Sequence, residues 1–132
     1  MNLEKPEIQL KIFLWLIALH SISVGIGLIL FPPSYLEIFG FYNYSYTFFQ
    51  AQGGVFHIVM SVAYLMAIKY IYKSPGLIYF SIAAKSMATI FLIIYFLFVE
   101  QSWMIIMSAT GDATMGIVLF YLYKKFQTIN IN

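Results

Sequence analysis

The chain contains no cysteine and no arginine, and only 9% of its 132 residues are charged. Without cysteine it cannot form disulfides, thiolate metal sites or a cysteine nucleophile. Its seven basic residues are all lysines and its net charge is only +2, so it lacks the broad basic face that a nucleic-acid partner requires. A water-soluble domain normally has about 25% charged residues, and this chain has too few to cover such a surface.

Hydrophobic residues are abundant instead, at 62% of the chain, and the mean hydropathy is +0.87. Soluble domains contain about 45–50% apolar residues. The composition therefore predicts an integral membrane protein surrounded by the lipid bilayer, and the length allows a single domain over residues 1–132. The first apolar segment lacks the short core and small-residue cleavage site of a signal peptide, so we expect it to remain as a helix.

Four segments are long and apolar enough to span a membrane, which takes about 20 mostly apolar residues each. We expect these spans at about Leu10–Leu30, Phe48–Lys69, Leu77–Phe98 and Trp103–Lys124. Pro32 and Pro33 end the first span, and a short segment follows at the membrane interface, with Ser34 as its expected N-cap and Gly40 at its end. Short connections make sequential helices antiparallel, so the expected fold is all-α: an up-down bundle of four transmembrane helices.

The distribution of lysines predicts the orientation of this bundle. Lysines flank both termini and the turn between the second and third spans, whereas the other two connections carry only Glu37 and Glu100. Because positive residues favour the cytoplasmic side, we expect a multi-pass protein of a bacterial cytoplasmic membrane with both termini in the cytoplasm. The one lysine that departs from this rule is Lys85, inside the third span.

Each predicted helix carries one titratable side chain near its middle, namely His20, His57, Lys85 and Asp112. With a rise of about 1.5 Å per residue, all four lie about 12–18 Å from the expected cytoplasmic ends, in one central layer. Charged residues within spans are costly and commonly mark ligand or proton sites. These four are therefore candidate ligand-binding or proton-relay residues. Gln50 and Gln52 lie in the outer half of the second helix, where they line an entry or cap and bond the adjacent loop, and Gln52 is a further candidate site residue.

Helical spacing predicts which faces of the four helices meet, because residues four apart share a face. The expected inward positions are Leu16, His20, Val24 and Gly27; Gly53, His57 and Ser61; Ser81, Lys85 and Thr89; and Ser108, Asp112 and Gly116. On three of the four helices, small or hydroxyl residues flank the titratable group. Such residues allow membrane helices to approach closely and to bond across the contact.

Lys85 and Asp112 lie on adjacent antiparallel helices, so we expect an ion pair or a close hydrogen bond between them. In hydrocarbon, an isolated carboxyl group takes up a proton and an isolated amine loses one, whereas side by side they keep their charges or share the proton. A purely structural role, in which the pair fixes the register of two helices, carries about equal weight with a role in a ligand or proton site. Taken alone, each histidine is more often a core residue bonded to a serine or a carbonyl group than part of a functional site.

The sequence contains no pattern that demands metal or enzyme chemistry. Lys85 in the same layer disfavours a cation beside the two histidines and Asp112, so we expect no metal site. Gly53 and Gly54 lie inside a span and are interpreted as packing residues rather than a phosphate loop. The Ser-x-x-Lys, Gly-x-Ser-x-Gly and His-Glu-x-x-His patterns do not occur, so no catalytic residue or cofactor is assigned.

Several stretches along nearly the whole chain resemble the BphX-like and DoxX-like groups of small four-helix membrane proteins. They are "LILFPPSYLEIFGF", "FFQAQGGVF" with "AYLMAIKY", "AAKSMATIFLIIYF" and "GDATMGIVLFYLY". The resemblance implies an up-down four-helix bundle, and some DoxX-like members are linked to quinone-related redox membranes. The chain departs from the pattern at the glutamines before Gly53 and Gly54, where many relatives would carry a basic residue. No catalytic residue is carried over.

The leading hypothesis is a non-enzymatic accessory or binding bundle, whose central polar layer holds a small amphipathic ligand or the polar group of a membrane-protein partner. One alternative is a proton-coupled transporter or a quinone- or redox-associated subunit, in which Lys85 and Asp112 change protonation and His57 relays protons. Four helices are few for a self-contained carrier, so this alternative requires a homo-oligomer. The other alternative is a purely structural polar core. A cavity that reaches His57 and Asp112 would favour binding.

Overall fold

The computed structural model describes residues 5–40 and 47–130, and within these ranges every regular element is a helix. The four long helices are α1 (Lys5–Leu30), α3 (Thr47–Lys69), α4 (Pro75–Phe98) and α5 (Trp103–Asn130). All four are long and apolar enough to cross a membrane. The predicted all-α fold with four spans is thus confirmed. α1 begins earlier and α5 continues further than the predicted spans.

The short segment after α1 consists of α2 (Pro33–Leu36) and the 3-10 helix η1 (Glu37–Phe39). Pro32, not Ser34, is the N-cap of α2, and Pro33 is its first residue, so the prediction for Ser34 is wrong. Proline suits this first position because its fixed φ is already helical and the N–H it lacks has no partner there. Gly40 ends the segment at φ 85°, a left-handed conformation that glycine adopts without a steric penalty.

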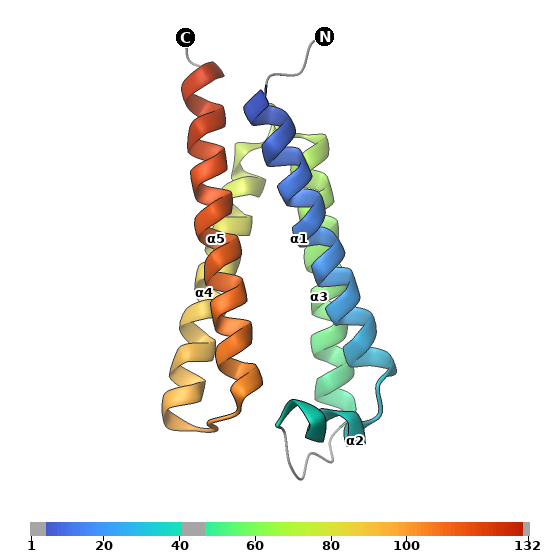
Figure 1. Ribbon diagram of the computed structural model, residues 1–132. Coiled ribbons are helices and arrows are strands. Elements are labelled where there is room, and N and C mark those ends of the chain that lie inside the picture. The colour runs from blue at the N-terminus through green and yellow to red at the C-terminus, as the bar shows by residue number, and fades with distance from the viewer. Residues whose placement is uncertain (1–4, 41–46, 131–132) are drawn as a thin grey trace.

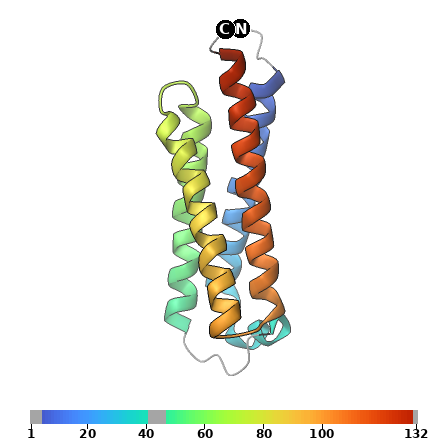
Figure 2. The same ribbon diagram turned by 90° about the vertical axis from the view of Figure 1, so that its left-hand side faces the viewer.

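The four long helices form an antiparallel bundle of two closely packed pairs (Figures 1 and 2). α1 packs along α3 and α4 packs along α5, whereas the contacts of α1 with α5 and of α3 with α4 are less extensive. The two pairs are closest at the end that carries both termini and diverge toward α2 (Figure 1). We call these the terminal end and the α2 end.

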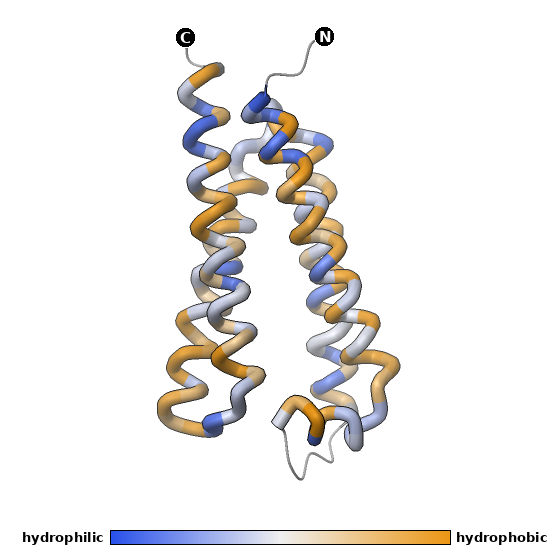
Figure 3. Tube along the Cα trace, in the orientation of Figure 1, coloured by the Kyte–Doolittle hydropathy of each residue, from blue (hydrophilic) through white to orange (hydrophobic). Residues whose placement is uncertain are grey.

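The hydrophobic core occupies the half of the bundle at the terminal end. Its buried residues come from all four long helices and include Ala18, Tyr64, Ile78 and Leu119. Figure 3 shows long hydrophobic stretches on all four helices, interrupted by hydrophilic segments part-way along both pairs. The titratable residues of the predicted central layer follow these core residues toward the α2 end, within about two helical turns. The polar layer thus lies where the core ends.

Near the α2 end, α1 and α3 touch through their backbones. A Cβ atom added to Gly25 would lie 2.7 Å from the Gly54 carbonyl oxygen, and one added to Gly54 would lie 2.6 Å from the Gly25 carbonyl oxygen. No residue other than glycine fits this contact without a shift of one backbone. Close approach of this kind is a main source of helix association in membranes, where the lipid is as apolar as the side chains.

The segment η1 joins the two helix pairs at the wide end of the bundle. Ser102 is the residue before α5, and its hydroxyl donates a hydrogen bond to the Phe39 carbonyl at 3.0 Å. The ring of Phe39 also packs against that of Trp103, with centroids 6.4 Å apart. The α2 end is therefore closed by a side chain and a ring contact, while the terminal end is closed by the hydrophobic core.

Candidate functional site

Lys85 and Asp112 form an ion pair between α4 and α5, at the point where the hydrophobic core ends. The Lys85 Nζ donates to Asp112 Oδ1 at 2.5 Å, and the two side chains are 5% and 16% exposed. Ser81, one turn before Lys85, is buried on the same face of α4. On α5, Gly116 makes room for the lysine stem, since a Cβ there would lie 3.4 Å from the Lys85 Cβ. The faces predicted for these two helices are those that meet.

The helix α3, from the other pair, provides a second contact for the Lys85 ammonium. The buried ring of Tyr64 has its centroid 6.0 Å from Lys85 Nζ, a distance at which the negative ring face attracts a cation. The Thr89 hydroxyl donates to the Lys85 carbonyl at 2.8 Å within α4. Lys85 thus links α5 and α3 and draws the two helix pairs together.

Both histidines lie near the ion pair but do not bond to it. Each imidazole is close enough to interact electrostatically with Lys85 and Asp112, which places all four groups in one region of the bundle. His57 is half-buried at the α1–α3 crossing, where its Cβ would be 3.3 Å from a Cβ on Gly25. Within residues 5–40 and 47–130, neither imidazole has a hydrogen-bond partner, so no direct hydrogen bond between described side chains joins His57 to Asp112.

The inward face predicted for the first helix is wrong. Leu16 is 56% exposed and His20 is also exposed, whereas the buried face of α1 runs through Leu14, Ser21 and Gly25. The reason is the backbone contact with α3, which Gly25 makes and Gly27 does not. The orientation of α1 is therefore set by the close contact at Gly25 and not by the position of His20.

Gln52 does not join the polar layer either. Its side chain is exposed on α3, and it lines neither of the two pockets described below. The neighbouring glutamine, Gln50, is the buried one, at 6% exposure, and its Nε2 donates to the Phe31 carbonyl at 2.8 Å. The buried face of α3 runs through Gly54 and Ser61, so of the predicted inward positions Ser61 is buried, whereas Gly53 and His57 are only partly buried.

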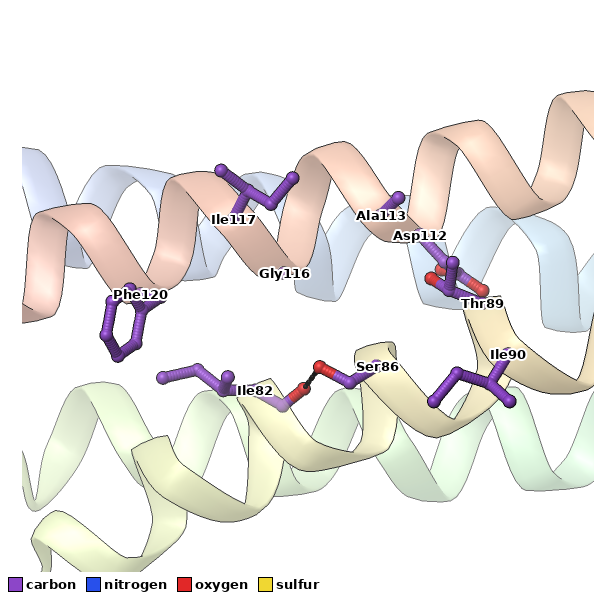
Figure 4. Close-up of a pocket in the computed structure, with 9 residues that line it drawn as sticks. All are labelled: Ile82, Ser86, Thr89, Ile90, Asp112, Ala113, Gly116, Ile117 and Phe120. Carbon is purple, nitrogen blue, oxygen red and sulfur yellow. Dashed lines mark hydrogen bonds between the residues drawn. The ribbon is translucent and has the colours of Figure 1, made fainter.

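A pocket of about 480 Å³ opens between α4 and α5 beside the ion pair (Figure 4). In that view α1 and α3 lie behind it, so the pocket faces away from the other helix pair. Its walls are mostly apolar, and its lining residues are Ile82, Ser86, Thr89, Ile90, Asp112, Ala113, Gly116, Ile117 and Phe120. The pocket reaches Asp112, but His57 does not line it.

The polar chemistry of this pocket is that of a hydrogen-bond acceptor. Asp112 Oδ1 accepts from Lys85, while Oδ2 accepts no hydrogen bond from any described residue. The hydroxyls of Ser86 and Thr89 already donate to carbonyl oxygens one turn earlier on α4, at 3.0 and 2.8 Å. A molecule in the pocket can therefore donate a hydrogen bond to the Asp112 carboxylate, while apolar side chains surround the rest of it.

Sequence reasoning missed a second buried charge, at the terminal end. Glu7 is only 2% exposed and accepts hydrogen bonds from Lys11 Nζ and Tyr72 Oη, each at 2.5 Å. Tyr72 lies in the turn between α3 and α4, so the contact fastens α1 to that turn. The spacing of Glu7 and Lys11, four residues apart, is the only local signal of this pairing in the sequence.

No protein-family model, curated protein sequence or solved structure matches this chain. The resemblance to the BphX-like and DoxX-like groups therefore stays a prediction, and the site must be interpreted from its own chemistry. In the part of the chain that the structure describes, no group of three or more His, Cys, Asp or Glu side chains could hold a metal ion.

Proposed function

We propose that this membrane protein is a non-enzymatic binding bundle, which holds a small amphipathic molecule in the pocket between α4 and α5. The molecule enters from the bilayer, places a hydrogen-bond-donating head at Asp112 and lays its apolar part along the pocket walls. The observation that carries the proposal is the uneven use of the Asp112 carboxylate. One oxygen is bound by Lys85, the other has no partner among the described residues, and Asp112 lines a pocket of about 480 Å³.

The surroundings of the carboxylate favour a neutral donor, such as a hydroxyl group. The Lys85 ammonium already balances the charge of Asp112, so a cationic head would leave an uncompensated charge in a region of low dielectric constant. A hydroxyl donates one hydrogen bond to the free oxygen and adds no charge. The volume also lies within the range of about 300–1,000 Å³ that is usual for small-molecule sites.

We also propose that the protein lies in a bacterial cytoplasmic membrane with its terminal end in the cytoplasm. The fold brings the lysines that flank the spans together at this end, on α1, α5 and the turn between α3 and α4. Glu37 and Glu100 lie at the α2 end. This segregation supports the orientation that the positive-inside rule predicts.

A variant that fills the pocket but keeps both charged residues tests this function. Ala113→Phe adds a ring to the lining, and Thr114→Phe adds the same ring at the next residue of α5, which is exposed and outside the pocket. Each protein is purified in a mild detergent, and the amphipathic molecules that accompany it are extracted and quantified by mass spectrometry. We expect the wild type and Thr114→Phe to retain the same molecule and Ala113→Phe to lose it.

The double variant Lys85→Met, Asp112→Leu separates binding from structure, because it removes the acceptor without leaving an unpaired charge. Replacing a buried ion pair with apolar residues of similar size is often neutral for stability. We therefore expect this protein to fold and to lose the bound molecule. Retention of the molecule by Ala113→Phe at the wild-type level would exclude the pocket as the site. If the double variant fails to fold and the wild type carries no bound molecule, the structural role of the pair is favoured.

A further inference from the structure

A second pocket, of about 540 Å³, lies at the α2 end between the last turn of α1 and the first turn of α3. It is separate from the Asp112 pocket and shares no lining residue with it. Its lining consists of Leu28, Ile29, Leu30, Phe31, Pro32, Pro33, Phe48, Gln50 and Ala51. Two helix ends of opposite polarity therefore meet at one pocket, the C-terminus of α1 and the N-terminus of α3.

Gln50 supplies this pocket with a hydrogen-bond acceptor that has no donor in the part of the chain that the structure describes. Its Nε2 donates to the Phe31 carbonyl at 2.8 Å, and this bond fixes which way the amide points. The Oε1 atom is therefore the free end, and it is a buried side-chain oxygen without a hydrogen-bond partner among the described residues. Buried polar atoms in proteins are nearly always hydrogen-bonded, and an exception commonly indicates a missing ligand or water.

The two prolines leave further acceptors on the same pocket wall. In a continuing helix, the N–H groups of residues 32 and 33 would bond the carbonyls of Leu28 and Ile29, but proline has no N–H. The Phe31 N–H bonds the Gly27 carbonyl at 2.9 Å, and no backbone donor among the described residues reaches the carbonyls of Leu28 or Ile29. The α1 wall of the pocket is thus rich in acceptors and poor in donors.

Charge narrows the class of ligand that fits these acceptors. The carbonyl end of α1 carries partial negative charge, and Glu37 and Glu100 lie at this end of the bundle, where the described connections contain no lysine. A cationic group with several N–H donors is therefore favoured over a neutral hydroxyl. On the opposite wall, the N-terminus of α3 carries the partial positive charge of the helix dipole, which suits a phosphate.

We propose that this pocket binds the headgroup of a membrane lipid with a primary ammonium group, such as phosphatidylethanolamine. The ammonium donates to Gln50 Oε1 and to the free carbonyls at the end of α1. The lipid phosphate faces the N-terminus of α3, and the acyl chains follow the exposed apolar side chains of Phe48 and Ile29 into the bilayer.

Native mass spectrometry of the full chain tests this inference with lipids that differ only in their headgroup. The detergent-purified protein is mixed with equal amounts of dioleoyl phosphatidylethanolamine, phosphatidylcholine and phosphatidylglycerol. Phosphatidylcholine has the same charges but no N–H donor, and phosphatidylglycerol has hydroxyl donors but no ammonium. We expect phosphatidylethanolamine to be retained at least threefold more than either. Equal retention of phosphatidylcholine would overturn the proposal, and equal retention of phosphatidylglycerol would overturn the assignment to an ammonium group.

Gln50→Leu should abolish the preference for phosphatidylethanolamine, whereas Gln52→Leu, two residues away and exposed, should keep it. A preference that persists in Gln50→Leu would contradict the role of Oε1. If Gln50→Leu does not fold, the test uses the wild type with mono- and dimethylated phosphatidylethanolamine. Retention of these lipids should fall with each N–H removed. Ala113→Phe should keep the preference, so this site and the Asp112 pocket succeed or fail independently.

Discussion

Replacing Gly54 with alanine is expected to destabilise the protein, while the same change one residue earlier, at Gly53, is expected to stabilise it. A Cβ on Gly54 would lie 2.6 Å from the Gly25 carbonyl oxygen and 2.7 Å from Ile29 Cγ1. A Cβ on Gly53 would meet only Leu28 Cδ1, at 3.9 Å, which is an ordinary contact. The two variants have the same composition and lie on the same helix, so the difference isolates the contact between the α1 and α3 backbones.

The magnitude follows from two opposing effects. Alanine stabilises a helix interior relative to glycine by about 0.5–1 kcal/mol. Overpacking of a tight contact typically costs about 1–3 kcal/mol, and here the obstructing atom belongs to a helix backbone, which cannot rotate away. Gly54→Ala should therefore lose about 1 kcal/mol on balance, and Gly53→Ala should gain about 0.5–1 kcal/mol.

Unfolding in mixed detergent micelles, with the loss of helix followed by circular dichroism as the denaturing detergent increases, measures both changes. Gly25→Ala should be as harmful as Gly54→Ala, because a Cβ on Gly25 would lie 2.7 Å from the Gly54 carbonyl. The double variant should lose less than the sum of the two single losses, since both act on one contact. If Gly53→Ala costs as much as Gly54→Ala, the crossing point of α1 and α3 is misplaced.

Three further predictions concern charged residues. Asp112→Asn and Lys85→Met should each reduce the free energy of unfolding, by up to about 3–5 kcal/mol, because each leaves a buried partner unpaired. Their combination should recover part of the loss, and simple addition in a double-mutant cycle would show that the pair is not coupled. Glu7→Gln should cost about 1–3 kcal/mol in the same unfolding assay, whereas Glu37→Gln, which is exposed, should change little. Single cysteines replacing Lys73 and Glu37 should react with a membrane-impermeant thiol reagent from opposite sides of the membrane, and labelling from one side would refute the topology.

The sequence was sufficient to predict the spans and the central ion pair because both follow from strong energetic constraints. Some 20 consecutive apolar residues have few stable arrangements other than a membrane helix. A lysine and an aspartate at mid-span are costly to bury alone, and short connections make α4 and α5 adjacent, so Lys85 and Asp112 had few other partners. Pairing within hydrocarbon is therefore predictable from position and topology.

The facing of α1 and α3 could not be predicted because it depends on details of backbone approach. α1 contains Gly25 and Gly27, and α3 contains Gly53 and Gly54, but only Gly25 and Gly54 lie against the backbone of the other helix. Successive residues point about 100° apart around a helix, so a small rotation changes which glycine faces the neighbouring helix. Hydropathy is too uniform along these helices to indicate that rotation. The same rotation buries Gln50 and exposes Gln52.

Asp112 is the only aspartate in the chain, so labelling with ¹³C-aspartate gives one carboxyl signal that reports on the site. The most direct test of the proposed function records this signal by solid-state NMR in bilayers, with a long-chain primary alcohol or the alkane of equal length added. The alcohol can donate a hydrogen bond to Asp112 Oδ2, and the alkane cannot. We predict that the alcohol shifts the carboxyl signal, that the alkane does not, and that Ala113→Phe abolishes the shift. An unchanged signal with the alcohol, or equal shifts with both molecules, would contradict the binding function assigned to this pocket.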